Sequence, residues 1–395
     1  MRNWSRKFAL ACGTISLLGW GTAAAQSPQK APAIALPDSG DLARWHMWVK
    51  DAGWLVITPA ADANAAIDTR IQDLEKAVRA AIQNGSADPA RIYLAGRGEA
   101  GSAVFYIASR IPDLWAAAVA LGGTPQPAID SGRLYTANFS NVPVLWAGSD
   151  VGDRPRAETL RAAGMGLDFR SLEGLTAGAV IDWLRQHARA EFPEAIDCET
   201  DAPAFASCYW IQMTKFDAAE RNDVLPSTRV PPSVSGALDL GGFGFKKEEP
   251  GPGVLVGYLP EKYSGPLKMG DRIVALDGRE IPDARRYVEI MAQVSAERPV
   301  VATVQRGKER IRIETRIVVP QRAPGVTARV QAKYLTEEKE VQIVSRTVTA
   351  MRVEIPGAWV GAILNWNGVP VEQVESAGCR LLTVEKAIQK AGNCL

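Results

Sequence analysis

The pattern of apolar residues differs before and after about residue 192. This difference indicates that the chain folds into more than one domain. From 42 to 192, short apolar runs such as Trp54–Thr58 alternate with segments in which apolar residues recur every three or four positions, as in 66–84. Buried strands that alternate with amphipathic helices predict a parallel sheet covered by helices on both faces. From 236 onward strands dominate, and a length of 395 residues also exceeds one ordinary core.

The first residues follow the pattern of a secretory signal peptide. Arg2, Arg6 and Lys7 precede an apolar stretch, which ends in three alanines, Ala23 to Ala25. We therefore expect residues 1–25 to be a signal peptide that is cleaved after Ala25. A membrane anchor is the alternative, but the stretch is shorter than the ~20 apolar residues that a span needs. The expected protein is periplasmic or secreted, of bacterial type, without a membrane span after cleavage.

The charge of the chain is almost balanced, with 45 basic and 44 acidic residues, so no nucleic-acid partner is expected. Signal cleavage would leave four cysteines, for which three pairings are possible. We favour the sequence-local pairing, Cys198 with Cys208 and Cys379 with Cys394, in which each bond contributes about 3 kcal/mol by restricting the unfolded chain. Long spacers without a neighbouring histidine argue against zinc, and no metal or cofactor is expected.

Proline signals and strand patterns divide the second half of the chain into three segments. Residues 193–235 contain the first cysteine pair and Val230-Pro231-Pro232, so we interpret them as a connector. Residues 236–322 are a strand-rich unit with one short helix. In 324–395, apolar and polar residues alternate from 328 to 334, and Asn367-Gly368 predicts a hairpin turn. This last segment is expected to be a small β-rich unit.

The segment 91–101, Arg-Ile-Tyr-Leu-Ala-Gly-Arg-Gly-Glu-Ala-Gly, joins an expected strand to an expected helix. With Asp88-Pro89 before it and residues 111–123 after it, the segment resembles the nucleophile elbow of α/β-hydrolases, particularly the secreted esterase and polyester-depolymerase-like members. The resemblance covers most of 42–192 and implies an α/β-hydrolase-like parallel-sheet domain. In that family the turn reads G-x-S-x-G. Here Gly96 and Ala100 keep the small flanks, but Gly98 stands where the serine would be.

The general base of the family is missing as well. It normally lies just before the last helix, where this chain has Gly-Leu-Thr-Ala at 174–177, and the only histidines are His46 and His187. We interpret both as structural, with His187 at the surface of the closing helix. The position of the acidic residue of the family's catalytic triad is ambiguous, since Asp150 and Asp153 both lie near the loop in which it is expected. Loss of the serine or of the base lowers turnover on the order of a million-fold.

We therefore expect no catalytic residue and interpret four residues as a vestigial elbow: Gly96, Gly98, Glu99 and Ala100. The N–H groups of this turn and the helix N-terminus remain an anion-attracting pocket, while a turn kept only for packing is the other interpretation. Ser102, four residues past Gly98, and Ser149 are the alternative nucleophiles of a rival hypothesis.

A second resemblance begins at Gly242-Phe243-Gly244-Phe245, which matches the small-apolar-Gly-apolar carboxylate-binding loop of PDZ domains. Residues 265–281 are similar to the GL-x-x-GD-x-I core of bacterial PDZ modules. A helix over 283–294 and strands over 300–306 and 310–318 follow in the expected order. The resemblance implies that 236–322 is a PDZ-like domain.

In such a loop, consecutive backbone N–H groups face the terminal carboxylate of a peptide, which adds as a strand and packs against the helix. Pro250-Gly251-Pro252-Gly253 shortens the strand that would receive the peptide. The expected peptide-binding residues are Gly242, Phe243, Gly244, Phe245, Tyr287, Val288 and Met291.

These patterns lead to three hypotheses of function. The first is an exported non-catalytic scaffold, in which a degenerate hydrolase domain accompanies a module that binds a protein or the C-terminus of a peptide. The second is a secreted serine esterase or peptidase with a relocated nucleophile, Ser102 or Ser149. The third is a carbohydrate or small-ligand binder that uses exposed aromatic residues such as Trp45, Trp48 or Trp146, although such residues more often belong to the core.

Overall fold

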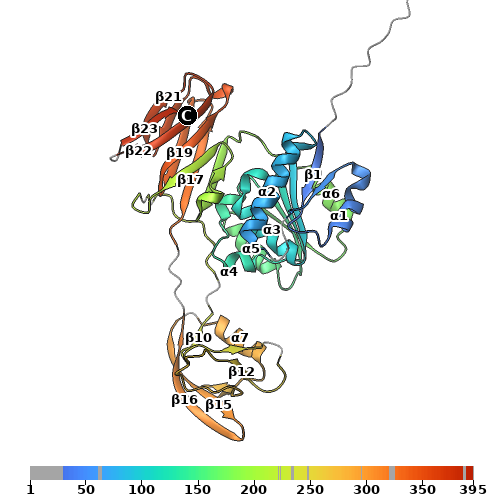
Figure 1. Cartoon of the computed structure of the whole chain (residues 1–395), viewed down its shortest axis with the longest axis vertical. Helices are drawn as coiled ribbons and strands as arrows, with labels where there is room; N and C mark the ends of the chain where they lie inside the picture. Colours follow the sequence, from blue (N-terminus) through green and yellow to red (C-terminus); the bar gives the residue numbers. More distant parts are fainter. Residues whose placement is uncertain are drawn as a thin grey trace, which may run out of the picture.

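The computed structural model of the chain describes residues 30–60, 65–220, 222, 224–232, 235–246, 249–294, 296–319, 325–385 and 388–394. The expected signal peptide, residues 1–25, lies outside this part. The described chain forms three units: an α/β domain, a β domain of two sheets, and a separate module (Figure 1). No helix within these ranges is long and apolar enough to cross a lipid bilayer.

The α/β domain is built on a six-stranded sheet in the order β2-β1-β3-β4-β5-β6, and every neighbouring pair is parallel. Its strands are β1 (Ala31–Ala35), β2 (Leu55–Ile57), β3 (Ala87–Arg97), β4 (Ala117–Leu121), β5 (Val144–Gly148) and β6 (Leu167–Ser171). Its helices are α1 (Leu42–Val49), α2 (Ile67–Gln83), α3 (Glu99–Arg110), α4 (Gln126–Asp130), α5 (Arg154–Ala162) and α6 (Ala177–Arg185). The predicted parallel sheet is confirmed.

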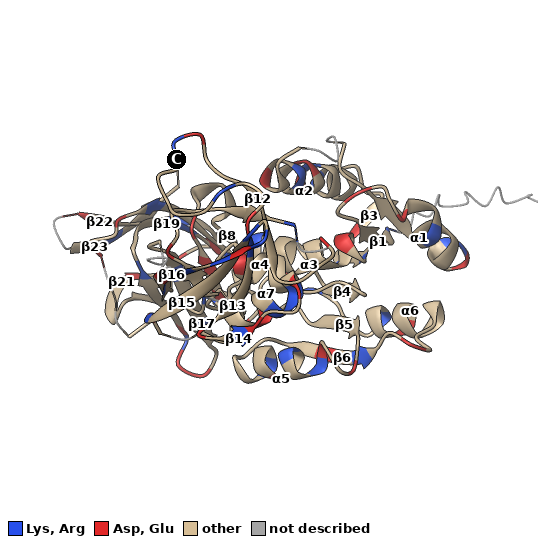
Figure 2. Ribbon diagram, turned by 90° about the horizontal axis from the view of Figure 1, so that it is seen from below, with Lys and Arg blue, Asp and Glu red and all other residues tan. Residues whose placement is uncertain are grey.

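Helices cover both faces of this sheet, because successive side chains of each strand point to opposite sides. Ile92 and Leu94 of β3 belong to one hydrophobic core, whereas Tyr93 and Ala95 belong to the other. The first core includes side chains of α2, α3, α4 and α5, and the second includes side chains of α1 and α6. Figure 2 shows α1 and α6 on one side of the sheet and α4 and α5 on the other.

Two strands of the sheet have little signal in the sequence pattern. β1 lies between β2 and β3 and precedes residue 42, where the pattern places the start of the domain. Its sequence, Ala-Pro-Ala-Ile-Ala, has one β-branched residue and therefore a low strand propensity. β6 is an edge strand in which polar and apolar residues alternate. The strand predicted at Trp54–Thr58 is β2, which is a half-buried edge strand.

The β domain consists of two five-stranded sheets that share one hydrophobic core, in the orders β21-β20-β18-β17-β7 and β23-β22-β19-β9-β8. Its strands are β7 (Ala195–Thr200), β8 (Ser207–Cys208), β9 (Ile211–Phe216), β17 (Ala328–Leu335), β18 (Glu340–Arg346), β19 (Val348–Ile355), β20 (Ile363–Trp366), β21 (Val369–Gln373), β22 (Gly378–Glu385) and β23 (Ile388–Asn393). The expected hairpin at Asn367-Gly368 joins β20 to β21, and both residues have positive φ.

Residues 193–235 differ from the expected connector, because they contribute three strands to this domain. β7 pairs with β17, and β9 pairs with β19. The segments 193–235 and 324–395 therefore fold as one unit rather than as a connector and a separate small unit. The pattern within either segment does not reveal this pairing, since the partners are more than a hundred residues apart, as in Cys198 opposite Val330.

Both disulfides have the sequence-local pairing. Cys198–Cys208 links β7 of one sheet to β8 of the other at one side of the domain. Cys379–Cys394 links the start of β22 to the residue that follows β23. The first bond joins the edge strands of two sheets, and the second closes a hairpin within one sheet.

The third unit is inserted into the β domain between β9 and β17. We call it the inserted module. Its sheet has the order β10-β16-β15-β13-β12-β11, with β14 paired to β13, and one helix, α7, packs on it. Its elements are β10 (Ala237–Leu238), β11 (Gly244–Phe245), β12 (Val254–Tyr258), β13 (Arg272–Leu276), β14 (Arg279–Glu280), α7 (Ala284–Ala292), β15 (Arg298–Arg306) and β16 (Glu309–Val318).

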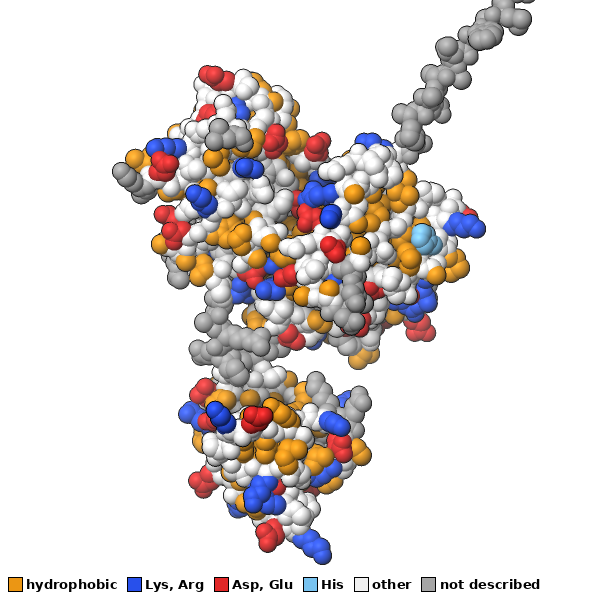
Figure 3. All heavy atoms as spheres, in the orientation of Figure 1, with side chains coloured by type: hydrophobic (Ala, Val, Ile, Leu, Met, Phe, Trp, Pro, Cys, Tyr) orange, Lys and Arg blue, Asp and Glu red, His pale blue; other side chains and the backbone are white. Residues whose placement is uncertain are grey.

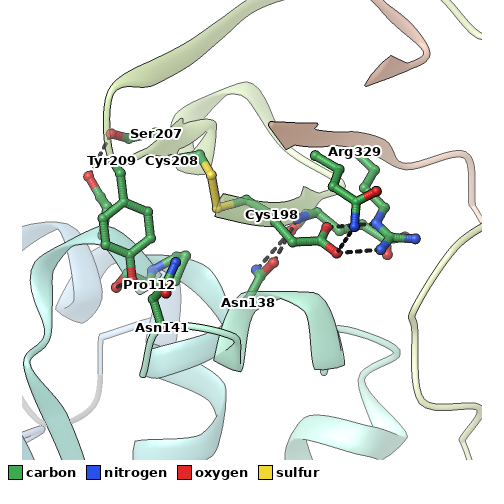
Figure 4. Close-up of a disulfide and its surroundings, with 12 residues drawn as sticks. Pro112, Asn138, Asn141, Cys198, Ser207, Cys208, Tyr209 and Arg329 are labelled. Carbon is green, nitrogen blue, oxygen red and sulfur yellow. Dashed lines mark hydrogen bonds and ion pairs between the residues drawn. A yellow bond between two sulfur atoms is a disulfide. The ribbon is translucent and has the colours of Figure 1, made fainter. Parts of the chain in front are cut away.

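Polar side chains join the α/β domain to the β domain (Figure 4). The side-chain amide of Asn138 donates to the backbone carbonyl of Glu199 at 2.9 Å and accepts from its N–H at 2.6 Å. The Tyr209 hydroxyl, next to the first disulfide, donates to the carbonyl oxygen of Pro112 at 3.2 Å. Because these groups are largely buried, their directional bonds fix how the two domains meet.

Candidate functional site

The elbow predicted from residues 91–101 is a sharp strand-to-helix turn. Gly98 follows β3 with φ 59° and ψ −120°, and α3 begins at the next residue. Other glycines permit the close approach of helix and strands: a Cβ on Gly96 would lie 2.3 Å from the carbonyl oxygen of Ala100. A Cβ on Gly123 would lie 2.3 Å from the carbonyl carbon of Gly101. The turn is therefore fixed by glycines that no other residue type could replace without movement.

This turn lies where a ligand site is expected in an α/β sheet. The connection from β1 leads to α1 on one face, and the connection from β3 leads to α3 on the other face. Ligands of such sheets bind beyond the carboxyl ends of the strands at this change of direction. A Cβ built on Gly98 meets no atom within 4 Å, so the position that a nucleophile would take is open.

In the described part of the chain, neither alternative serine has a histidine among its hydrogen-bond partners. The Ser102 hydroxyl accepts from the Thr124 N–H at 2.9 Å and donates to the Gly98 carbonyl at 3.4 Å. These two bonds give Ser102 a structural role in tying α3 to the loop after β4. Ser149 is exposed in the turn after β5, and its hydroxyl accepts from the Gly152 N–H at 3.4 Å.

The two histidines lie on α1 and just after α6, the helices that cover the face of the sheet opposite to α3. His46 is exposed on α1. His187 follows the end of α6 rather than lying on the helix surface, and its ring is 4.4 Å from that of Trp183. Burial lowers the pKa of His187, against the opposing effect of Asp168. Its buried Nε2 has no hydrogen-bond partner among the described residues.

The loops that would supply the acid and the base have other roles. Asp153 accepts from the Ser149 N–H at 2.8 Å, and Asp150 forms an ion pair with Arg154. In the loop at 172–176, Thr176 caps α6 by accepting from the Ala179 N–H. These contacts stabilise the turns that contain them.

Two of the three tryptophans named for a carbohydrate site are buried. Trp45 and Trp146 are 1% and 0% exposed, and Trp146 donates from its indole nitrogen to the Gly123 carbonyl. Trp48 is half-buried against Trp45. The carbohydrate-binding interpretation of Trp45 and Trp146 is wrong, because their rings lie inside the hydrophobic cores.

The inserted module has a groove of about 320 Å³ between β11 and α7. Six of the seven expected peptide-binding residues line it: Gly242, Phe243, Phe245, Tyr287, Val288 and Met291. The seventh, Gly244, forms β11 with Phe245. The ring of Phe245 meets that of Tyr287 edge to face at 5.5 Å. The structure thus brings together, on one side of the sheet edge, residues that are about 45 positions apart in the sequence.

The groove ends at a loop with free backbone amides. Gly241 and Gly242 have φ of 81° and 77°, which only glycine adopts readily. Among the described residues, the N–H groups of Gly242 and Phe243 have no hydrogen-bond acceptor. The hydroxyl of Tyr263 supports the loop by donating to the Leu240 carbonyl at 2.6 Å. Adjacent unpaired N–H groups form a local positive potential that suits an anion.

The remaining wall of the groove could not be read from the sequence motifs. Residues 235–238, where the chain enters the module, also line the groove. The Gly236 N–H donates to the Met291 carbonyl at 2.8 Å, which holds this segment against α7. Burial raises the pKa of the Tyr287 phenol to about 12, and a backbone bond from Leu238 opposes the rise. The phenol is therefore neutral at physiological pH.

The Gly270-Asp271 pair of the second motif has a structural role. Asp271 is 1% exposed and accepts from Arg306 at 2.9 and 2.7 Å and from the Lys268 N–H at 2.7 Å. Burial by itself would raise the pKa of this carboxyl, but the bonds from Arg306 and Lys268 outweigh it and lower the pKa. The bonds between Asp271 and Arg306 hold the turn before β13 to the end of β15. Neither Gly270 nor Asp271 lines the groove.

Acidic and basic side chains are interspersed over the face of the molecule that Figure 3 shows. No group of three or more His, Cys, Asp or Glu residues in the described ranges could hold a metal ion. The site with the clearest geometry is thus the groove of the inserted module.

No family model matches the chain, and no curated protein matches it. Several solved structures resemble it in part. A thermostable esterase is 14% identical over 41% of this chain and 56% of its own, with a TM-score of 0.31, so the match spans about half of that protein. Esterase PE8 is 15% identical over 40% of this chain and 92% of its own, with a TM-score of 0.30. Esterase Est22 is 14% identical over 40% of this chain, with a TM-score of 0.33. Likenesses at this level say nothing about the chemistry of this chain.

Proposed function

We propose that the chain is an exported, non-catalytic binding protein whose inserted module, of PDZ type, holds the carboxyl-terminal end of a polypeptide. The observation that carries this proposal is the pair of free amides at Gly242 and Phe243, which lie at one end of an apolar groove. Amides of this kind suit a terminal carboxylate, and the groove suits the apolar side chain of the last residue.

Besides the free amides and the apolar groove, the open edge of the sheet is a third feature that can bind the peptide. β11 is the last strand of its sheet, so one of its sides has no neighbouring strand in the described part. An extended peptide can pair with such an edge through main-chain hydrogen bonds. Because β11 has two residues, the pairing is short, and the ligand is recognised mainly through its last few residues.

The α/β domain, which we take to be hydrolase-like, contributes a binding or scaffold surface in this proposal. Gly98 has no side chain to attack a carbonyl, and the two histidines lie on α1 and just after α6, on the other face of the sheet from α3. The two disulfides support an oxidising compartment, and hence a periplasmic or secreted location.

The experiment is a titration of the purified chain with fluorescent peptides that end in Leu, Val or Phe. Each peptide is prepared with a free carboxylate and with a terminal amide. The free acids should bind, and amidation should weaken binding by about tenfold or more, because a charge-assisted hydrogen bond contributes on the order of 2 kcal/mol. Equal binding of acid and amide, or binding by neither form, would contradict the proposal.

A pair of variants on α7 locates the site. Val288→Glu places a carboxylate in the groove and should abolish binding of the free acids. Arg285→Ala changes an 85% exposed side chain on the same helix outside the groove lining and should leave binding unchanged. Thermal melting of both variants shows whether the fold is retained.

A further inference from the structure

The exposed ring of Tyr258 lies beside Gly244, a residue of the edge strand β11. Tyr258 ends β12 and lies opposite Gly244 of β11, while the next pair is Phe245 opposite Val256. A Cβ built on Gly244 would lie 3.0 Å from Cβ of Tyr258, 3.4 Å from Cδ1 and 3.6 Å from Cγ. The ring thus occupies the space above a residue that has no side chain, and Tyr258 remains 62% exposed.

The two pairs point to opposite faces of the sheet. Phe245 lines the groove, and its partner Val256 is 1% exposed in the core. Gly244 faces the outer side because successive residues of β11 alternate. Tyr258 lies on the same side, since its Cβ is beside Gly244, and the register shift between the two pairs interrupts the alternation along β12. The aromatic ring stands on the side of the sheet that the groove does not use.

We propose that Tyr258 selects the penultimate residue of the bound polypeptide and favours an aromatic side chain there. This inference rests on the proposed function. If the last side chain enters the groove, the residue before it must point to the outer side, since a bound strand also alternates. We place the last residue opposite Phe243, whose N–H faces the carboxylate. The residue before it then lies opposite Gly244, about 5 Å away across the strand pair and beside the Tyr258 ring.

Physical chemistry limits which side chains gain from this contact. An aromatic partner adds apolar contact and the quadrupolar attraction of an aromatic pair, whereas alanine does not reach the ring. A cationic side chain would also attract the ring, but exposed Lys246 directly follows β11 and adds positive charge at this edge. The structure therefore favours Trp, Tyr or Phe over Arg or Lys at the penultimate position.

The test compares peptides that differ only in the penultimate residue, Trp, Lys or Ala, in a fluorescence titration of the whole chain. The wild-type chain should bind the Trp peptide about 3- to 10-fold more tightly than the Ala peptide, the range that aromatic pairs give. In Tyr258→Ala this ratio should fall close to one, while the affinity for the Ala peptide changes less than about twofold. Tyr258→Phe keeps the ring and should keep the preference.

Ile388→Ala is the matched control, because Ile388 is 60% exposed in the β domain, and this variant should keep the wild-type ratio. Melting temperatures close to that of the wild type show that the variants fold. Equal binding of Trp and Ala peptides, or a preference that survives in Tyr258→Ala, overturns the role of Tyr258 and leaves the proposed function intact. A stronger preference for Lys than for Trp overturns the aromatic specificity. Binding of no peptide overturns both.

Discussion

Glu199 on β7 accepts a hydrogen bond at 2.5 Å from the hydroxyl of Thr327, which lies 128 positions later in the chain. The same carboxylate accepts from Ser227 and from the N–H and hydroxyl of Thr228, at 2.6 and 2.9 Å. Ser227 and Thr228 precede the inserted module, and Thr327 follows it. One buried side chain therefore holds together the two points at which the chain leaves and re-enters the β domain.

We expect Glu199→Ala to lower the free energy of unfolding by about 3 kcal/mol, because it leaves the buried Thr327 hydroxyl and the Thr228 amide without their acceptor. Urea unfolding measures the change. Limited proteolysis should also cut faster around residue 227. Glu158→Ala, which removes an exposed carboxylate on α5, is the control, and equal effects of the two variants would contradict this role.

The Cys198–Cys208 bond should stabilise the β domain by about 3 kcal/mol, since it closes a loop between residues 10 positions apart. Replacement of both cysteines by Ala should lower the unfolding midpoint, and dithiothreitol should lower the wild-type midpoint but not that of a variant without both disulfides. If dithiothreitol leaves the melting temperature of the wild-type chain unchanged, the Cys198–Cys208 bond does not stabilise the fold as predicted.

Stability of the inserted module should depend on pH through Asp271. The folded-state pKa lies below the ordinary 3.8, so the stabilisation is complete above that value and is lost as the pH falls through the lower folded-state pKa. At pH 7, Asp271→Asn should lower the free energy of unfolding by about 2 kcal/mol, because it removes the charge-assisted hydrogen bonds from Arg306 to the buried carboxylate. The difference from wild type should shrink below about pH 4 in thermal melts. Glu314→Gln changes an exposed carboxylate, and its difference in stability from wild type should not shrink as the pH falls.

A serine introduced at Gly98 should not give the chain hydrolase activity. Gly98→Ser fits the open space at this position, at a cost of about 2 kcal/mol for a non-glycine residue in this sparsely populated backbone conformation. With no imidazole beside it, the new hydroxyl should neither hydrolyse a chromogenic ester nor react with a fluorophosphonate probe.

The wild-type chain tests the rival hypothesis in the same assays. Ester turnover that disappears in Ser102→Ala would establish the relocated nucleophile and end the non-catalytic interpretation. Turnover that disappears in Ser149→Ala would do the same for the second serine. We expect neither, because Ser102 is bound by backbone groups and Ser149 lies in an exposed turn.

The local patterns of the sequence were sufficient for several features. Helical periodicity placed α2, and Asn367-Gly368 placed the hairpin between β20 and β21. Local spacing also indicated the pairing of the cysteines. These features depend on contacts between residues close in the sequence, so propensity and turn chemistry decide them.

The tertiary structure decided what depends on distant partners. β1 has a weak strand signal, yet it lies inside the sheet because β2 and β3 flank it. Two of the three strands in the expected connector, β7 and β9, find their partners β17 and β19 beyond the inserted module, and the third, β8, pairs with β9. The ring of Tyr258 over Gly244 likewise follows from strand register, which no local pattern contains. The sequence indicated the strongly patterned elements and six of the ten residues that line the groove. Long-range pairing determined which segments form one domain and which side chains meet at the edge of the module's sheet.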